Sequence, residues 1–373
     1  VTVDDLVDLA PEWDVLIALQ GCPDPLRRAS WLRAWWYAFG ATRDSREAMI
    51  LTARTEGRLV GAAPLMIERF PGGPTALRHL GNSSHWFDPD ILIDPAVPAA
   101  RDALAAAIAE IPCDLVVLED LAEGSPTIAA LRGTMPKALV VAQGENRHRF
   151  RTADPPPLGK RRKANRNRIR VAERAGRALE ITTAVDADEI VAGLDEALDL
   201  TERVWRVRGD SSEVTHPAGR RYVREAVTGL RSGQATLTRV RANGTLIAFD
   251  LALREGSGAV MFRGNWDPES GISGGGWMSM LAAMDHLVAA GAEEIDFGKF
   301  DWPYKQAVSS VPQVGLVTVA LPRGVMGAAA LRLWRSRPAL LAMRTRIRTT
   351  AQRARTIPRR GPTEALGGAG TTG

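Results

Sequence analysis

The sequence predicts an α+β protein with two tandem domains of similar architecture, each a mixed, mostly antiparallel sheet flanked by helices. Three observations support this prediction. The length of 373 residues suggests two domains, at roughly 150 residues per domain. Segments typical of a helix, a hairpin and further strands occur in the same order in both halves of the chain. The run "TADPPPLG" separates the halves, because consecutive prolines cannot join a sheet or the interior of a helix.

The first predicted domain, residues 1–150, begins with a helix and continues mainly as strands. In "SWLRAWWYAFG", Trp31 and Trp35 recur at the spacing of one helix face, and Ser30 is the expected N-cap. The segment "AMILTARTEGRLVGAAPLMIERF" predicts a hairpin with a tight turn at "TEGR". The runs "ALRHLG", "PDILIDP" and "DLVVLEDL" are typical of strands, and a helix is expected over 99–109, between the last two.

The second predicted domain, residues 151–325, starts with a basic helix from about Lys160 to Ala175. A strand, "LEITTA", and two helices, "DEIVAGLDEALDLTERVWRVRG" and "PAGRRYVREAVTGLRSG", follow. A meander of three strands comes next, and Asn243-Gly244 in its first turn is a strong hairpin signal. A glycine-rich loop then leads into a helix over 277–290, followed by the strands "EEIDFG" and "GLVTVALP". Residues 326–373 are expected to form a basic helical segment with a disordered end.

The composition excludes several classes of protein. A hydrophobic fraction of 45% and a charged fraction of 24% are ordinary for a soluble globular protein. No apolar run is long enough to cross a bilayer, and the start of the chain has no features of a secretory leader. Cys22 and Cys113 lie far apart and the histidines show no HxxxH spacing, so neither a disulfide scaffold nor a bound metal is expected. These features favour a cytoplasmic protein.

Positive charge is unevenly distributed along the chain. The net charge is +5, and most of the excess lies in residues 147–177 and 332–360. Basic blocks of this kind attract the phosphates of a nucleic acid, a cofactor or a membrane surface. The alternative is that both blocks are solvated helix faces.

The glycine-rich loop "GISGGGWMSM" is the strongest local candidate for a binding site. It matches neither the P-loop motif nor GxGxxG. However, a strand ends at about Asn265 and a helix begins at Gly276 or Trp277, and the first turn of a helix has unpaired N–H groups that attract anions. Glycines allow an anion to approach this backbone closely. The alternative is a plain helix-entry loop with Ser273 as the cap.

The segment "GNWDPESGISGGGWMSMLAAMDHLVAAGAEEIDFG" resembles the acyl-CoA-binding core of the GNAT N-acyltransferase superfamily. More narrowly, residues 28–320 look like the CelD-like group of cellulose-biosynthesis-associated acetyltransferases, which is related to the Fem-type aminoacyltransferases. The segments that carry this resemblance are "SWLRAWW", "GRLVGAAPLM", "KRRKANRNRIRVAERAG", "ERVWRVRGDSS", "GTLIAFDLAL" and "YKQ". It implies two tandem GNAT-like domains and transfer of an acyl group from acyl-CoA, with an acetyl or longer chain, to an amine of a small-molecule or sugar-type acceptor.

The resemblance also implies a donor site in the second domain. A bulged strand is expected to leave a backbone N–H free to bind the thioester oxygen, and the glycine-rich turn is expected to hold the CoA pyrophosphate. The implied residues are Met261, Phe262, Arg263 and Gly264 in the strand, with Gly264 fitting the bulge, and Ser273, Gly274, Gly275, Gly276 and Trp277 in the turn. The first domain has no glycine-rich turn before a helix, so it is not expected to bind CoA.

Four residues are candidates for the catalytic chemistry. Tyr304 is expected to protonate the leaving thiolate, and the alternative is a packed aromatic residue. Lys305 is a candidate to contact a phosphate or carboxylate. Asp250 and Asp296 are candidates for the general base, because a carboxylate within an apolar strand is usually paired or functional. A chain of water molecules could replace a single base.

The alternative to a catalytic role for Asp250 and Asp296 is a structural one, in which the carboxylate forms a salt bridge to Arg263 or Arg239.

Acceptor-binding residues are expected in two places. "VWRVRGDSS" contains Trp205, Arg208 and Asp210 in the region that covers the acceptor in GNAT folds. The loop "GNSSHWFDPD" gathers His85, Trp86 and Asp88 in the first domain.

Two further functions remain open. In an aminoacyl-tRNA-dependent enzyme of the Fem type, the basic helix and the arginine-rich tail would hold tRNA phosphates. In an inactive double-GNAT module, the tail would bind nucleic acid or, weakly, an anionic membrane. No obligate protein partner is inferred.

Overall fold

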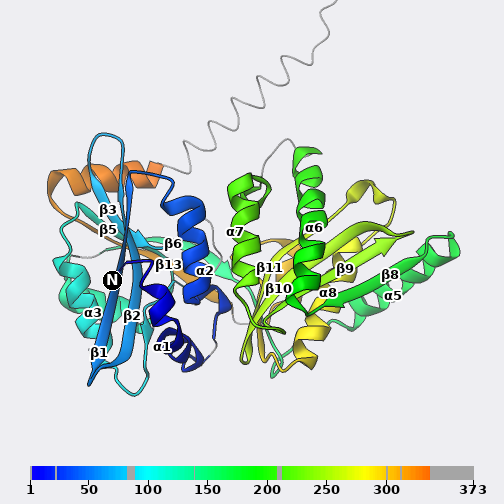
Figure 1. The fold of residues 1–373 in the computed structure, drawn as a ribbon, viewed down its shortest axis with the longest axis horizontal. Coiled ribbons are helices and arrows are strands. Elements are labelled where there is room, and N and C mark those ends of the chain that lie inside the picture. The colour runs from blue at the N-terminus through cyan, green and yellow to red at the C-terminus, as the bar shows by residue number, and fades with distance from the viewer. Residues whose placement is uncertain are drawn as a thin grey trace, which may run out of the picture. The chain divides into compact units, whose positions relative to one another are not determined.

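The computed structural model describes residues 2–21, 23–81, 89–137, 139–207, 212–299, 301–310 and 313–336. It confirms the predicted α+β class, because helices flank two mixed sheets (Figure 1). Within the described residues, the first sheet has seven strands and the second has six. Both sheets belong to one compact unit, Val1–Leu331, and Arg332–Gly373 forms a separate unit.

The first sheet combines strands from the first half of the chain with one strand from much further along. Its strands follow the order β1-β2-β3-β5-β13-β6, with β4 paired to β2. The only parallel neighbours among the described strands of this sheet are β3 and β5. The bounds are β1 (Arg46–Thr55), β2 (Arg58–Arg69), β3 (Thr75–His79), β4 (Leu92–Ile93), β5 (Leu115–Ala122), β6 (Leu139–Arg147) and β13 (Val314–Pro322).

The position of β13 differs from the sequence-based domain boundaries, which assigned this segment to the second domain. In the structure, β13 lies between β5 and β6 and pairs antiparallel with both. The physical reason is that strand pairing between distant segments leaves no local pattern in the sequence.

The second sheet follows the order β7-β12-β11-β10-β9-β8. Its parallel pair is β11 with β12, and the other described neighbours are antiparallel. The bounds are β7 (Arg149–Arg151), β8 (Leu179–Ala184), β9 (Ala235–Ala242), β10 (Thr245–Glu255), β11 (Gly258–Trp266) and β12 (Glu294–Asp296).

Both predicted hairpins are confirmed. Their turns, Glu56–Gly57 and Asn243–Gly244, have positive φ at both residues, as a two-residue hairpin turn with this twist requires.

Helices cover both sheets. The helices are α1 (Leu6–Ala18), α2 (Ala29–Trp35), α3 (Ala99–Glu110), α4 (Pro126–Thr134), α5 (Gly159–Arg174), α6 (Ala187–Val207), α7 (Pro217–Thr228), α8 (Gly275–Ala289) and α9 (Pro303–Val308). Shorter helical turns are η1 (Pro25–Arg27), η2 (Trp36–Gly40), η3 (Glu213–Thr215) and η4 (Pro268–Ser270). Helices α1, α4 and α9 were not predicted from the sequence. The predicted N-cap of α2, Ser30, is wrong, because this helix begins at Ala29, after extended backbone at Arg28.

One hydrophobic core joins elements from both halves of the chain. Trp31 of α2 packs edge-on against Tyr222 of α7 and Phe262 of β11, with ring centroids 5.6 and 5.1 Å apart. The indole of Trp35 is also fully buried in this core. The aromatic helix predicted for the first half therefore supports β11 in the second sheet.

The end of the described chain is helical. Residues 324–331 form a helix in the first unit, with Ala330 and Leu331 buried. In the second unit, residues 332–336 are helical, and the rest of the predicted basic segment lies outside the described residues. None of the helices that the structure describes is long and apolar enough to cross a membrane.

Candidate active site

A wedge opens between the two parallel strands of the second sheet. β11 and β12 pair only from Gly258 with Glu294 to Val260 with Asp296, where β12 ends. β11 continues to Trp266 and remains paired with β10 on its other side. Beyond Val260, this edge of β11 therefore has no strand partner among the described residues. Its backbone N–H and C=O groups can bind an extended ligand chain.

A bulge interrupts β11 at the mouth of this wedge. Leu251 of β10 pairs with Arg263, whereas the next residue, Ala252, pairs with Met261. Phe262 is thus the extra residue, and its ring packs against Trp31. The irregularity expected within Met261–Gly264 is present, but it lies at Phe262 and not at Gly264. A bulge disrupts the ladder locally and redirects backbone groups.

Gly264 has a different role, which is to make room for the Asp250 carboxylate. The two residues are paired across β10 and β11. A Cβ atom on Gly264 would lie 2.1 Å from Oδ1 of Asp250, far inside contact distance. The carboxylate therefore lies directly against the backbone of β11, next to the bulge.

Asp250 faces α8. Its neighbours on the same strand face, Ala248 and Ala252, pack in clusters that contain residues of α8. Burial raises the pKa of Asp250 to about 7, although a hydrogen bond from Ser279 of α8 favours the ionised form. The salt-bridge alternative is wrong for Asp250, because no ion pair to it occurs among the described residues. Arg239 pairs instead with Glu189.

Tyr304 lies on the short helix α9, within electrostatic range of Asp250. Burial of the phenol, followed by the negative charge of Asp250, raises the pKa of Tyr304 to about 12. The side chain still exposes 42% of its surface. Tyr304 is thus a protonated phenol at neutral pH that is accessible from solvent and close to a buried carboxyl group.

The other two catalytic candidates are occupied by structural contacts. Asp296 accepts hydrogen bonds from Nε of Arg147 at 2.6 Å and from the N–H of Gly298 at 2.5 Å. Lys305 is 1% exposed and donates from Nζ to the carbonyl oxygen of Lys299 at 2.5 Å. The structure therefore presents neither side chain to a ligand. The salt-bridge alternative holds for Asp296, with Arg147 in place of the partners named from the sequence.

The glycine-rich turn forms the start of α8. Gly274 is the N-cap residue in a left-handed conformation, with φ 83°, and no side chain caps the helix. Ser273 is exposed and is not the cap that the alternative interpretation required. The first bonds inside the helix run from Trp277 and Met278 to the carbonyl of Gly274. The N–H groups of Gly275 and Gly276 thus precede the first bonded turn, where an anion is favoured.

The basic helix α5 lies beside this turn. A Cβ on Gly274 would lie 2.7 Å from Cδ of Arg168, so this arginine side chain passes directly over the glycine. Arg161 stacks on Trp277, with its guanidinium 4.6 Å from the ring centroid. Within the described chain, Arg168 has no ion pair. The sequence analysis missed Arg168, because its only local signal is the basic character of the whole helix and its position depends on the fold.

The expected acceptor residues fall mostly outside the described chain. Arg208 and Asp210 lie outside it, as do His85, Trp86 and Asp88. Trp205 is described and is half-buried on α6.

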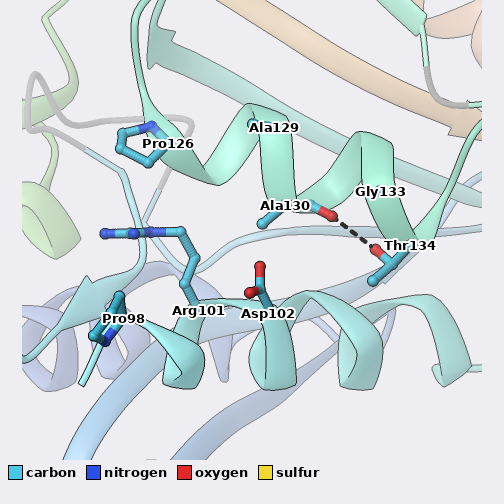
Figure 2. Close-up of a pocket in the computed structure, with 8 residues that line it drawn as sticks. All are labelled: Pro98, Arg101, Asp102, Pro126, Ala129, Ala130, Gly133 and Thr134. Atoms are coloured by element: carbon cyan, nitrogen blue, oxygen red, sulfur yellow. Dashed lines mark hydrogen bonds between the residues drawn. The ribbon is translucent and has the colours of Figure 1, made fainter.

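A groove of about 480 Å³ lies elsewhere, between α3 and α4 (Figure 2). Pro98 and Pro126 stand at one end of it and Thr134 at the other. It is lined by Pro98, Arg101, Asp102, Pro126, Ala129, Ala130, Gly133 and Thr134. This groove shares no residue with the wedge or with the Asp250–Tyr304 pair.

Comparisons with known proteins agree with this geometry. Residues 159–306 match the family model described as Acetyltransferase (GNAT) domain. The comparison with curated proteins gives no match. The matched segment contains α5, the wedge, the glycine-rich turn and Tyr304.

Several solved structures share the fold. A conserved protein of unknown function from Bacteroides thetaiotaomicron VPI-5482 is similar with a TM-score of 0.55 and 13% identity, over 86% of this chain and 98% of that one. FemX is similar with a TM-score of 0.55 and 13% identity, over 82% and 95%. L-PGS from Bacillus licheniformis is similar with a TM-score of 0.51 and 11% identity, over 82% and 91%. At these identities the likeness shows the fold alone. Residues 159–306 thus match a GNAT acetyltransferase domain, within a chain whose two mixed sheets flanked by helices have the predicted α+β class.

Proposed function

We propose that the protein is an N-acyltransferase that moves an acyl group from acyl-CoA to an amine of a small-molecule or sugar-type acceptor. The observation that carries this proposal is the open wedge beside the bulge at Phe262, with the uncapped start of α8 close by. The unpaired edge of β11 suits the amide groups of a pantetheine chain, which can bond to backbone as a strand does. The family match over residues 159–306 supports the same assignment.

The start of α8 fits the phosphates of such a donor. Uncapped N–H groups and the positive end of the helix dipole favour a pyrophosphate. Arg168 adds a guanidinium at Gly274, and a guanidinium can bond two phosphate oxygens at once. The absence of side chains at Gly274, Gly275 and Gly276 allows close approach.

The two titratable groups have the properties that acyl transfer to an amine requires. As the C–N bond forms and the C–S bond breaks, the amine loses a proton and the thiolate gains one. Asp250, with its pKa raised to about 7, is suited to accept the proton near neutral pH. Tyr304, with its pKa raised to about 12, retains its proton and is suited to supply it to the leaving thiolate. In this scheme Asp296 and Lys305 stabilise the surrounding structure.

Binding of acetyl-CoA tests the donor assignment directly. At ~100 times the dissociation constant, a ligand raises the free energy of unfolding by ~2.7 kcal/mol. We expect thermal stabilisation by acetyl-CoA, and about a tenfold weaker affinity in Arg168→Ala, since one charge-assisted phosphate contact is lost. Arg170→Ala is the matched control, because Arg170 is an exposed arginine on the same helix and has no described contact with α8. If neither acetyl-CoA nor longer acyl-CoAs stabilise the wild-type chain, the proposal is wrong.

A second candidate donor is an aminoacyl-tRNA, as in a Fem-type enzyme. Lys163, Arg166, Arg170 and Arg174 recur along α5 at intervals of three or four residues, and they are exposed. Such a row suits a phosphate backbone. Charged tRNA that binds with a steep salt dependence, together with no response to acyl-CoA, would favour this function over the first.

A further inference from the structure

A buried histidine binds both ends of the helix that carries Tyr304. His148 lies between β6 and β7, and its side chain is fully buried. Its Nε2 is 2.8 Å from Oδ1 of Asp301, which precedes α9, and its Nδ1 is 3.2 Å from Oγ of Ser309, which follows α9. One imidazole ring thus connects the two flanks of a single helix.

The two partners of His148 belong to opposite flanks of α9. Ser309 also donates its hydroxyl proton to the carbonyl of Lys305, at 2.6 Å, which ties this serine to the helix itself. His148 thus contacts one polar group on each side of α9, each through a different ring nitrogen.

The backbone of His148 is fixed independently of α9. Its N–H donates to the carbonyl of Gly298 at 3.2 Å, and its carbonyl accepts from Phe297 at 2.8 Å. Both partners follow directly after β12. The ring therefore projects from a rigid part of the second sheet toward a helix of only six residues. A helix this short is not stable alone and depends on tertiary contacts for its position.

We propose that His148 is a positioning residue that holds α9 by its two flanks and thereby fixes the orientation of Tyr304. This inference rests on the proposed function for the chemical roles of Tyr304 and Asp250. Lys305, which bonds to Lys299, provides a separate anchor inside the helix. The two bonds of His148 restrain the ends of α9, which sets the direction of the helix and hence of the phenol.

Two single variants each disrupt one contact of His148. Ser309→Ala removes its hydroxyl partner at the end of α9, and Asp301→Asn replaces its carboxylate partner before α9 with an uncharged and weaker acceptor. Ser310→Ala is the matched control, because Ser310 is an adjacent buried serine whose hydroxyl bonds to Arg151 and Asp154 and not to His148. His148→Asn and His148→Gln each keep one donor, near the former Nδ1 or Nε2, and remain usable if a larger change prevents folding.

The readout is the titration of Tyr304, followed by NMR of tyrosine labelled with ¹³C at Cζ. Tyr37 and Tyr222, the other two tyrosines, are internal references. In Ser309→Ala and Asp301→Asn we expect the pKa of Tyr304 to fall from about 12 towards its ordinary value of about 10, since a displaced phenol loses its burial and its proximity to the charge of Asp250. The kcat for transfer from acetyl-CoA should fall about tenfold with little change in KM, because a proton donor is displaced.

The outcomes separate this inference from the proposed function. If Tyr304 titrates as in the wild type in both variants, or shifts equally in Ser310→Ala, His148 is not a positioning residue. If Tyr304 shifts as expected but Tyr304→Phe leaves acyl transfer unchanged, the positioning geometry stands and the catalytic role of Tyr304 is wrong.

Discussion

Each sheet has a wedge between two parallel strands, and a buried arginine spans the first wedge, whereas a buried carboxyl group lies beside the second. In the first sheet, β3 and β5 pair only at Ala76 with Leu115 and at Leu77 with Val116. The next residue of β3, Arg78, is 4% exposed and bonds to Glu119 of β5 and to Glu68 of β2, both at 2.6 Å. This ion pair spans the space between β3 and β5 where a ligand would have to lie.

In the second wedge, the ion pairs of Asp296 and Glu294 on β12 run to Arg147 and Arg149, on the β7 side and not towards β11. Asp250 is buried beside it without an ion pair among the described residues, and its pKa is raised to about 7. Breaking a buried ion pair strongly destabilises a fold, so such a pair has a structural role. A buried carboxyl group without a cationic partner has a raised pKa, which suits proton transfer near neutral pH. The comparison supports the expectation that the first domain does not bind CoA. Under the proposed function, the first wedge is structural and the second binds the acyl donor.

Removing the charge that closes the first wedge is expected to have the largest effect. Arg78→Met removes one of the two arginine partners of the buried Glu68 and a partner of the half-buried Glu119, and it should lower the free energy of unfolding by about 3–5 kcal/mol, measured by urea denaturation. Arg206→Met is the control, because Arg206 pairs with Glu202 at the surface and their side chains are 72% and 40% exposed. This control substitution should lower the free energy of unfolding by less than about 1 kcal/mol. Equal losses in the two variants would contradict a structural role for the closed wedge.

The charge state of Asp250 should make stability depend on pH. Its carboxyl ionises near 3.8 in the unfolded chain and near 7 in the folded chain, so between these values the folded state retains a proton that the unfolded state has lost. This group's contribution is fully present below about pH 3.8 and is lost as pH rises to about 7, by a few kcal/mol in total. Asp250→Asn should lack this component in urea titrations across that range. An identical pH profile in the two proteins would show that Asp250 is ionised at acidic pH.

Filling the space at Gly264 is expected to change the free energy of unfolding by the smallest amount of the three predictions, through one defined contact. Gly264→Ala places Cβ into the Asp250 carboxylate and should destabilise the fold by about 1–3 kcal/mol. The double variant Gly264→Ala with Asp250→Ala should recover much of this loss, which a double-mutant cycle measures. Gly133→Ala on α4 is the control, because a Cβ there meets nothing within 4 Å. Additive losses in the cycle would refute the contact.

The helices and strands themselves were predicted from the sequence more successfully than the pairing of the strands and the packing of the helices. The hairpins at Gly57 and Gly244 were predicted because a turn of this type needs positive φ at adjacent residues, which is a local property. The α1 helix was missed, and it contains Pro11, a residue that normally argues against a helix. Its buried stripe, Leu6, Leu9, Trp13, Leu16 and Ile17, is nevertheless regular.

In the candidate site, too, features set by the local sequence were predicted, whereas features set by packing against other elements were not. Asp250 is a candidate because a carboxylate in an apolar strand is visible in the sequence, and Tyr304 is a candidate because the GNAT resemblance implies a tyrosine in this region; both remain predictions. The bulge was predicted for the correct strand but at Gly264 in place of Phe262, since register depends on the neighbouring strand. Arg168 and Ser279 act through α5 and α8, whose packing the sequence does not specify residue by residue.

The location of β13 has a consequence for how the chain folds during synthesis. Strands β5 and β6 are complete by residue 147, but the strand that lies between them ends at residue 322. At 5–20 residues per second, a ribosome needs roughly 10–35 s to add the intervening segment. Throughout that interval the first sheet has two unpaired apolar edges. A fragment that ends near residue 150 would keep them permanently, so the first half of this chain should aggregate when it is expressed alone.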